Sequence, residues 1–272
     1  MERLLSKLMT ARDFLAAGVI MAVLSFVWPA ALCAGQGPGI LNKTTLIAHA
    51  MGQIGENSYT NSLEAFTTNY AKGKRVFEVD LTLTNGNDVV CCHDNQEKAY
   101  GLDKNIHQIT RQEFLARRIY GKYTPLDLAG LLSLMLKYKD IYIVTDTKDD
   151  FTTIFERIYK SSMSRDPKLL DRIIPQVYGE KDINDLSRYY RFKNIIFTLY
   201  RSKMTDDEVV LFVKKNHINA VTMSVNRFTP ELVRKLSDHG VPAFVHTVND
   251  PEQVKKFRAQ GVHGFYTDSY AD

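Results

Sequence analysis

The chain has 272 residues, of which 44% are hydrophobic and 24% charged. It can therefore bury a large core, and a disordered protein is excluded. The formal net charge is +4, and the basic residues are spread along the sequence rather than clustered. This distribution gives no footprint for nucleic acid, so we expect no nucleic-acid partner.

The first 35 residues differ from the rest of the chain. Arg3, Lys7 and Arg12 precede an apolar run from Phe14 to Leu32, and small residues follow it. This order is typical of a secretory signal peptide, and an uncleaved anchor is the alternative because about 19 apolar residues can cross a bilayer. Either reading predicts an exported protein, whether periplasmic, secreted or membrane-anchored and facing outside. An anchor would add membrane association through residues 1–35.

Residues 36–42 contain the glycine- and proline-rich stretch QGPGIL and are predicted to form a linker. Residues 43–272 then form one domain, which we expect to be monomeric. Short apolar runs alternate there with stretches that have apolar residues at helical spacing. The nine runs are LIAHA, VFEVDL, VVCCH, IYIVTD, RIIPQVY, IIFTLY, AVTMS, AFVHTV and GFYTD. Alternating strands and helices indicate a parallel sheet, and this number of units favours an α/β fold with a single (β/α)8 TIM barrel over a doubly wound open sheet.

Capping residues mark the predicted helix starts. Asn61 followed three residues later by Glu64 is read as a capping box. The three later start signals are Thr205, Thr229 and Asp250. Because each of them precedes a stretch with helical spacing, they support the alternation of strands and helices.

One pair of runs leaves no room for a helix and predicts an irregular β-hairpin early in the barrel. Only 85–87, Asn-Gly-Asn, separates VFEVDLTLT from DVVCCHD, and Asn-Gly is a strong signal for a two-residue hairpin turn. Such a turn pairs Asp80 with Cys91 and Glu78 with His93. A longer loop would shift this register.

Alternation along the first strand of the hairpin places Glu78 and Asp80 on one face. Taken alone, that face is most simply the solvated side of a half-exposed strand. In a barrel, however, the same face would point inward, while Phe77, Val79 and Leu81 would face the outer helices.

Ionisable residues gather at the ends of the predicted strands, where the reactive groups of a barrel enzyme lie. They are His49, Glu78, Asp80, His93, Asp94, Asp146 and Lys148. Carboxylates without cysteine favour a hard divalent cation, Mg²⁺ or Ca²⁺. Histidines outside the coordination shell can transfer protons, and a lysine can contact an anion. Gln176 ends the fifth run and is expected to face the same site, and the whole set predicts phosphoester cleavage.

The motifs IAHAMG, YTNSLEAF, FEVDLTLTNGNDVVCCHD, YTPLDL, VTDTK and HTVNDPEQVKKFRAQGVHGFYTD occur in this order between Thr45 and Asp268. Together they resemble the glycerophosphodiester phosphodiesterase family, within the phospholipase-C-like phosphodiesterase superfamily. The resemblance implies a TIM barrel, a divalent cation and hydrolysis of a phosphodiester by two histidines. The implied substrates are glycerophosphodiesters or (lyso)phospholipid headgroups.

The resemblance also implies roles for individual residues. By position, His49 and His93 correspond to the general acid and base. The implied metal ligands are Glu78, Asp80 and Asp146, and Lys148 is the implied phosphate contact. In the family reaction, a neighbouring hydroxyl of the substrate attacks phosphorus to give a cyclic phosphate, which water then opens.

Several positions depart from the family pattern. The usual Arg after the first His is Ala50, and the usual Pro-Glu before the helix is Tyr59-Thr60. The third acidic ligand, commonly Glu, is Asp146, as in the related sphingomyelinase-D-like phospholipases, and the aromatic position before Thr-Val-Asn is His246. Two alternatives therefore stay open: a sphingomyelinase-D-like phospholipase, and a catalytically weak barrel that binds headgroups.

Overall fold

A computed structural model of the chain describes residues 39–271. The predicted signal peptide or anchor, residues 1–35, lies outside the described residues. Within residues 39–271, each helix is too short or too polar to cross a membrane.

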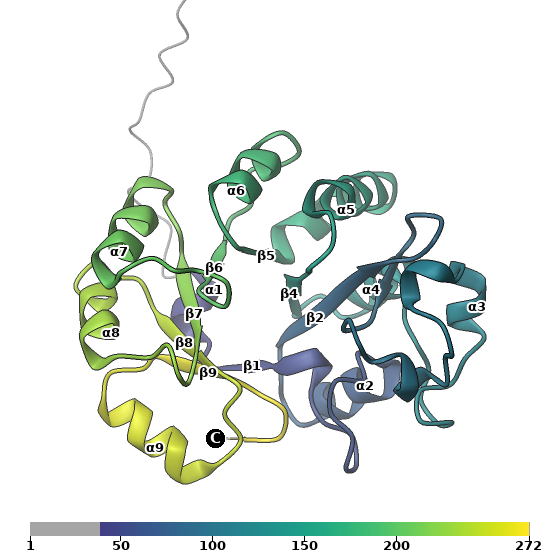
Figure 1. Ribbon diagram of the computed structural model, residues 1–272, viewed down its shortest axis with the longest axis horizontal. Coiled ribbons are helices and arrows are strands. Elements are labelled where there is room, and N and C mark those ends of the chain that lie inside the picture. The colour runs from purple at the N-terminus through teal and green to yellow at the C-terminus, as the bar shows by residue number, and fades with distance from the viewer. Residues whose placement is uncertain (1–38, 272) are drawn as a thin grey trace, which may run out of the picture. The chain divides into compact units, whose positions relative to one another are not determined.

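Eight parallel strands of the described chain form a closed barrel surrounded by helices (Figure 1). In order around the barrel they are β1 (Leu46–Ala48), β2 (Val76–Leu83), β4 (Tyr142–Asp146), β5 (Ile173–Val177), β6 (Ile196–Thr198), β7 (Ala220–Ser224), β8 (Ala243–His246) and β9 (Gly264–Thr267). The barrel closes because β1 pairs with both β2 and β9. The predicted (β/α)8 barrel is confirmed, and the open-sheet alternative is wrong.

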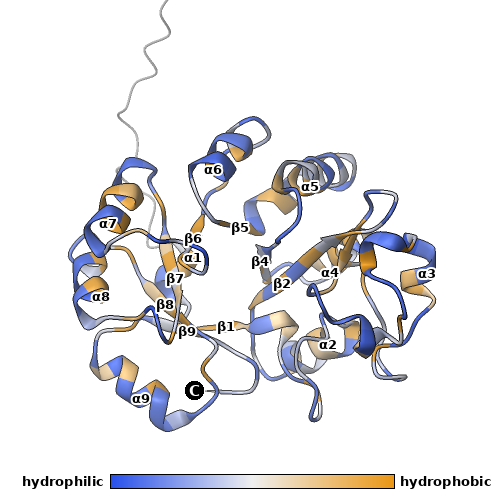
Figure 2. Ribbon diagram, in the orientation of Figure 1, coloured by the Kyte–Doolittle hydropathy of each residue, from blue (hydrophilic) through white to orange (hydrophobic). Residues whose placement is uncertain are grey.

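Amphipathic helices cover the outside of the barrel. They are α2 (Leu63–Ala71), α4 (Leu128–Lys137), α5 (Phe151–Arg165), α6 (Glu180–Ser187), α7 (Asp206–Lys215), α8 (Pro230–Ser237) and α9 (Pro251–Ala259). A short helix, α3 (Arg111–Leu115), belongs to an insertion before α4. Figure 2 shows hydrophobic and hydrophilic residues side by side on these helices, as expected for helices with one buried face.

Strand β2 has the predicted two faces. Phe77, Val79 and Leu81 are buried in the core cluster between the strands and the helices. Glu78 and Asp80 are also buried, at 3% and 4% exposure, but on the inner face of the barrel. The reading of this face as the solvated side of a strand is therefore wrong.

The structure differs from the predicted linker, residues 36–42, in its second half. Ile40–Lys43 form helix α1. Leu41 on this helix is 1% exposed and clusters with Val76, Ile196 and Ala220, the first residues of three barrel strands. The barrel interior needs apolar filling at this end, and α1 supplies it.

The hairpin is present, but the predicted pairing of Asp80 with Cys91 is wrong. Strand β3 (Val89–Cys91) runs antiparallel to β2, with Leu81 opposite Cys91 and Leu83 opposite Val89. The register is therefore shifted by one residue, and the pairing of Glu78 with His93 is wrong as well.

A three-residue loop causes this shift. Thr84 N–H donates to Asp88 O at 2.9 Å, so 85–87 form the loop. Asn87 adopts the left-handed conformation with φ 56°, which such loops place at their third residue.

The start of α2 also differs from the prediction. Its N-cap is Ser62, whose Oγ accepts from Ala65 N–H at 3.1 Å, so the capping box of Asn61 and Glu64 is wrong. Glu64 instead accepts from the Thr124 backbone N–H and hydroxyl, both at 2.7 Å. The other three predicted caps are confirmed. They are Thr205 at α7, Thr229 at α8 and Asp250 at α9.

Candidate active site

A cavity of about 180 Å³ lies at the C-terminal ends of the barrel strands. Seven of the eight residues singled out in the sequence line it: His49, Glu78, Asp80, His93, Asp146, Lys148 and Gln176. The eighth, Asp94, is not among the lining residues. The closed barrel brings them together because the C-terminal ends of parallel strands meet at one rim.

Three buried carboxylates form the centre of the cavity. Glu78, Asp80 and Asp146 each offer an oxygen, and these oxygens lie within 4.8 Å of one another. Burial and the negative charge of Asp80 raise the pKa of Glu78 well above its usual value, although the charge of His49 opposes this. Buried like charges need a counter-charge, and an all-carboxylate set suits a hard divalent cation. These residues could therefore hold Mg²⁺ or Ca²⁺.

Backbone and amide groups fix the orientation of the two carboxylates on β2. Glu78 Oε2 accepts from the Ala50 backbone N–H at 2.7 Å. Asn61 Nδ2 donates to Asp80 Oδ2 at 2.9 Å, and the Asp80 backbone N–H donates to Asn61 Oδ1 at 3.1 Å. The departure at Ala50 therefore leaves the backbone contact to Glu78 in place, and Asn61 serves the site rather than the helix start.

Asp146 at the end of β4 is held by three donors. Lys148 Nζ donates to its Oδ2 at 2.7 Å, while Gln176 Nε2 and the Tyr178 hydroxyl donate to Oδ1 at 3.0 and 2.5 Å. Burial alone would raise the pKa of Asp146, but the charge of Lys148 and these hydrogen bonds lower it. Gln176 Oε1 accepts from the Tyr266 hydroxyl at 2.8 Å, so both ends of this amide are engaged by protein. Gln176 and Lys148 thus orient the third carboxylate.

His49, which follows β1, pairs with an aspartate from the last strand end. Its Nδ1 lies 2.9 Å from Asp268 Oδ1, and Asn249 Nδ2 donates to Asp268 Oδ2 at 2.8 Å. Burial favours a lower pKa for His49, but the bond to Asp268 and the charges of Glu78 and Asp80 outweigh it and raise the pKa to about 9. His49 is therefore held as an imidazolium when the carboxylates carry no cation.

Sequence reasoning missed three of these partners, Asp268, Asn249 and Asn61. Asp268 ends the ninth apolar run, GFYTD, so the rule that singled out Asp146 could have found it. Asn61 carried a plausible local signal for a helix cap. Its φ of 47° is set by the fold and has no signal in the sequence.

His93 follows β3 and has a defined tautomer. Its Nδ1 lies 2.5 Å from the backbone oxygen of Asp94 and 3.0 Å from Asp94 Oδ1. A carbonyl oxygen only accepts, so Nδ1 carries the proton and Nε2 of a neutral His93 keeps its lone pair. The ring of Tyr59 lies edgewise against both imidazoles, with centroids 4.6 Å from His49 and 5.4 Å from His93.

A third histidine forms part of the opposite wall. His246 at the end of β8 lies beside Thr222, with 3.1 Å between Nδ1 and Oγ1. Burial, and then the positive charge of His49, lower the pKa of His246 to about 4. His246 is therefore uncharged at neutral pH, and the ring of Tyr200, which is 63% exposed, lies 6.5 Å from its ring.

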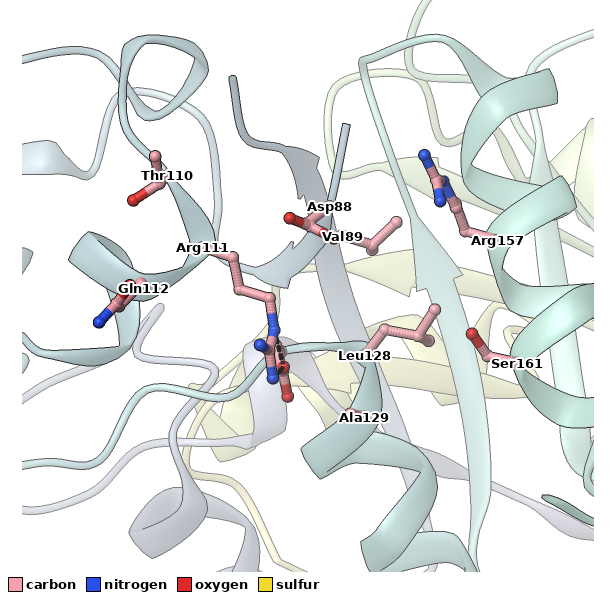
Figure 3. A pocket seen from close by; sticks show the side chains of 10 residues that line it. Asp88, Val89, Thr110, Arg111, Gln112, Leu128, Ala129, Arg157 and Ser161 are labelled. Carbon is pink, nitrogen blue, oxygen red and sulfur yellow. Dashed lines mark hydrogen bonds and ion pairs between the residues drawn. The ribbon is translucent and has the colours of Figure 1, made fainter. Parts of the chain in front are cut away.

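A second cavity, of about 410 Å³, lies at the β2–β3 hairpin and helices α3, α4 and α5 (Figure 3). Arg111 enters it but forms an ion pair with Asp127, 2.5 Å from Nη2 to Oδ2. The same carboxylate caps α4 through the Gly130 N–H at 2.7 Å. This cavity contains none of the seven predicted site residues.

The cavity at the strand ends therefore combines three carboxylates that could hold a cation, three histidines and a lysine. In a comparison with known families, the model of the "Glycerophosphoryl diester phosphodiesterase family" matches residues 54–271. The chain belongs to this family. The match includes Glu78, His93 and Asp146, whereas His49 lies just before it. The predicted glycerophosphodiester phosphodiesterase class is confirmed.

Solved structures share the fold of this phosphodiesterase at low identity. A glycerophosphodiester phosphodiesterase from Parabacteroides distasonis has 20% identity and a TM-score of 0.67, with 82% of this chain and 92% of that chain covered. One from Thermotoga maritima has 21% identity and a TM-score of 0.61, with 82% and 94% covered.

A phosphodiesterase from Oleispira antarctica, solved in complex with the product sn-glycerol-3-phosphate, has 14% identity and a TM-score of 0.69, with 83% and 93% covered. No curated protein matches the sequence significantly.

Proposed function

We propose that this family member hydrolyses glycerophosphodiesters with His49 and His93 as the proton-transferring pair and a divalent cation at Glu78, Asp80 and Asp146. The observation that supports this most is the convergence of three buried carboxylates and two histidines on one cavity. A bound cation would supply positive charge to the non-bridging oxygens of the phosphate, which favours nucleophilic attack on phosphorus.

The hydrogen bonds of the two histidines suggest different roles. His49 faces Asp268 through Nδ1, which stabilises its protonated form, so we assign it as the general acid that protonates the leaving alcohol oxygen. His93 donates through Nδ1 to a carbonyl, so its free Nε2 is assigned as the base. It would take the proton of the attacking hydroxyl, either a neighbouring hydroxyl of the substrate or water.

The substrate would lie between the metal-binding carboxylates and the wall that contains His246. The cavity volume of about 180 Å³ favours glycerophosphodiesters with a small alcohol. The product complex of the Oleispira antarctica enzyme supports glycerol 3-phosphate as one product. Lysophospholipid headgroups are a second candidate class, supported by Asp146 in place of the more common Glu.

The test replaces each histidine with alanine and follows release of glycerol 3-phosphate by ³¹P NMR. We expect His49→Ala and His93→Ala to lower turnover of glycerophosphocholine about 10²–10⁴-fold. A glycerol phosphodiester with a p-nitrophenyl leaving group needs no protonation, so it should restore turnover in His49→Ala but not in His93→Ala. The control is His239→Ala, which changes an exposed histidine outside the cavity.

Two results would contradict this proposal. Full activity of either variant would exclude the two-histidine mechanism. Wild-type protein that binds phosphodiesters without any turnover would instead favour the weak headgroup-binding barrel.

We also propose that the barrel acts outside the cytoplasm. The support is the sequence of residues 1–35, where basic residues precede an apolar run and small residues follow. Fractionation of the producing cell, with Edman sequencing of the recovered protein, tests this. Recovery of the whole protein from the cytoplasm with an intact N-terminus would exclude it.

A further inference from the structure

Tyr59 lines the cavity and has a backbone conformation that is unusual for tyrosine. It adopts a left-handed backbone with φ 59°, which residues other than glycine seldom do and which often marks a functional position. The neighbouring left-handed residue, Asn61, is accounted for by its two bonds to Asp80. Within residues 39–271, no hydrogen bond to the Tyr59 hydroxyl is found, although its side chain is half-buried.

The ring of Tyr59 contacts both histidines that are proposed to transfer protons. It meets His49 and His93 edgewise at interplanar angles of 84° and 89°. Its hydroxyl is within electrostatic reach of Asp268, Asp80 and Lys148. Burial, followed by the nearby negative charges, raises the pKa of the phenol, so it keeps its proton and stays a donor at neutral pH.

The cavity has one amine donor for a phosphate. Among its described lining residues, Lys148 is the sole lysine or arginine, and one of its three Nζ hydrogens is donated to Asp146. The hydroxyls of Tyr178 and Tyr266 donate to Asp146 and Gln176. Tyr59 is therefore the half-buried phenol at this site with a free hydroxyl.

We propose that Tyr59 is a substrate-binding residue whose hydroxyl donates a hydrogen bond to a non-bridging oxygen of the phosphate, while its ring keeps the two imidazoles apart. The inference builds on the proposed function, since it places the phosphate between His49 and His93. It concerns binding, however, and can be measured without turnover.

The test is the dissociation constant of sn-glycerol 3-phosphate, measured by isothermal titration calorimetry at saturating Mg²⁺. A hydrogen bond to a charged group contributes enough that Tyr59→Phe should bind about tenfold more weakly or worse. The matched control is Tyr120→Phe, another left-handed tyrosine, with φ 52° and 44% exposure, outside the cavity. It should bind like wild type.

A second variant separates the hydroxyl from the ring. Tyr59→Leu should weaken binding at least as much as Tyr59→Phe and should also shift the pH profile of turnover, because the imidazoles lose their spacer. If Tyr59→Phe binds like wild type and Tyr59→Leu alone is impaired, Tyr59 only positions the histidines and the inferred hydrogen bond is wrong.

The outcomes also distinguish this inference from the proposed function. Wild-type protein that binds glycerol 3-phosphate but hydrolyses no diester contradicts the proposed function, and a weaker dissociation constant for Tyr59→Phe would still support this inference. If the wild-type protein hydrolyses diesters and Tyr59→Phe binds glycerol 3-phosphate as tightly as wild type, this inference alone is contradicted. Absence of binding by the wild-type protein would overturn it as well.

Discussion

The strongest support for the positive charge of His49 comes from a partner near the other end of the chain. Asp268 is 219 residues away in sequence and 2.9 Å away in the fold. Asn249 fixes the second oxygen of the same carboxylate. A histidine paired in this way keeps its proton and its ring orientation, and both properties suit a general acid.

Asp268→Asn should therefore lower the pKa of His49 from about 9. The carboxylate that favours the imidazolium would be lost, while burial would still favour the neutral ring. NMR titration of the imidazole in EDTA-treated protein measures this. The control is Asp149→Asn, which removes the partner of His107 at 2.8 Å and should leave His49 unchanged. An unaltered pKa of His49 in Asp268→Asn would show that Asp268 does not hold the proton.

The same pair makes stability depend on pH in the cation-free protein. The folded pKa of His49, about 9, exceeds the ordinary 6.5, so its stabilising contribution is complete below pH 6.5 and is lost as pH rises through 9. Asp268→Asn should therefore cost about 1–3 kcal/mol at pH 6 and much less at pH 10. Urea unfolding at the two pH values checks this sign.

The individual site residues could be predicted because barrel strands end in the residues that react. His93 and Asp146 each end an apolar run, and Glu78 stands out by alternation along its strand, so the sequence shows all three directly. Their partners could not be predicted in the same way. The contact of Asn61 with Asp80 needs a backbone turn that the fold imposes, and a helix cap was the simpler local explanation.

At the scale of elements, the hairpin shows how one loop residue sets a register. The Asn-Gly signal predicted the hairpin correctly, but it did not fix the loop length. Asn87 tolerates the left-handed conformation, so a three-residue loop forms in place of a two-residue turn. Strand β3 therefore pairs one residue further along β2 than predicted.

Substitutions in this loop test the register. Gly86 does not have a positive φ, and a Cβ there would meet Asp88 at an ordinary 3.5 Å, so Gly86→Ala should change stability by no more than about 0.5 kcal/mol. Asn87→Val should cost roughly 1–2 kcal/mol, because a β-branched residue is placed at φ 56°. Urea denaturation compares the two. The opposite order would support the two-residue turn.

At the scale of the whole barrel, the filling of its N-terminal end matters for stability. The alternation of nine apolar runs with helical stretches was enough to predict the closed barrel. Helix α1 could not be predicted, because Gly and Pro in QGPGIL are typical of a linker and a four-residue helix has little signal of its own. Burial of Leu41 among inward-facing strand residues holds α1 against this end of the barrel.

Leu41→Ala should destabilise the protein by about 2–5 kcal/mol, since Leu41 is almost completely buried. The control is Leu211→Ala on α7, where the side chain is 65% exposed and the expected change is within about 0.5 kcal/mol. Urea unfolding measures both. Equal stability of the two variants would show that α1 does not fill the barrel.

In the proposed mechanism, phosphodiester hydrolysis depends on a cation held by Glu78, Asp80 and Asp146. The most direct measurement is release of glycerol 3-phosphate from glycerophosphocholine after EDTA treatment and during titration with Mg²⁺ or Ca²⁺, for wild type and Asp80→Asn. We predict that EDTA abolishes turnover, that one of the two cations restores it in wild type, and that Asp80→Asn needs far more cation. Undiminished turnover of the wild-type protein in EDTA would contradict the account.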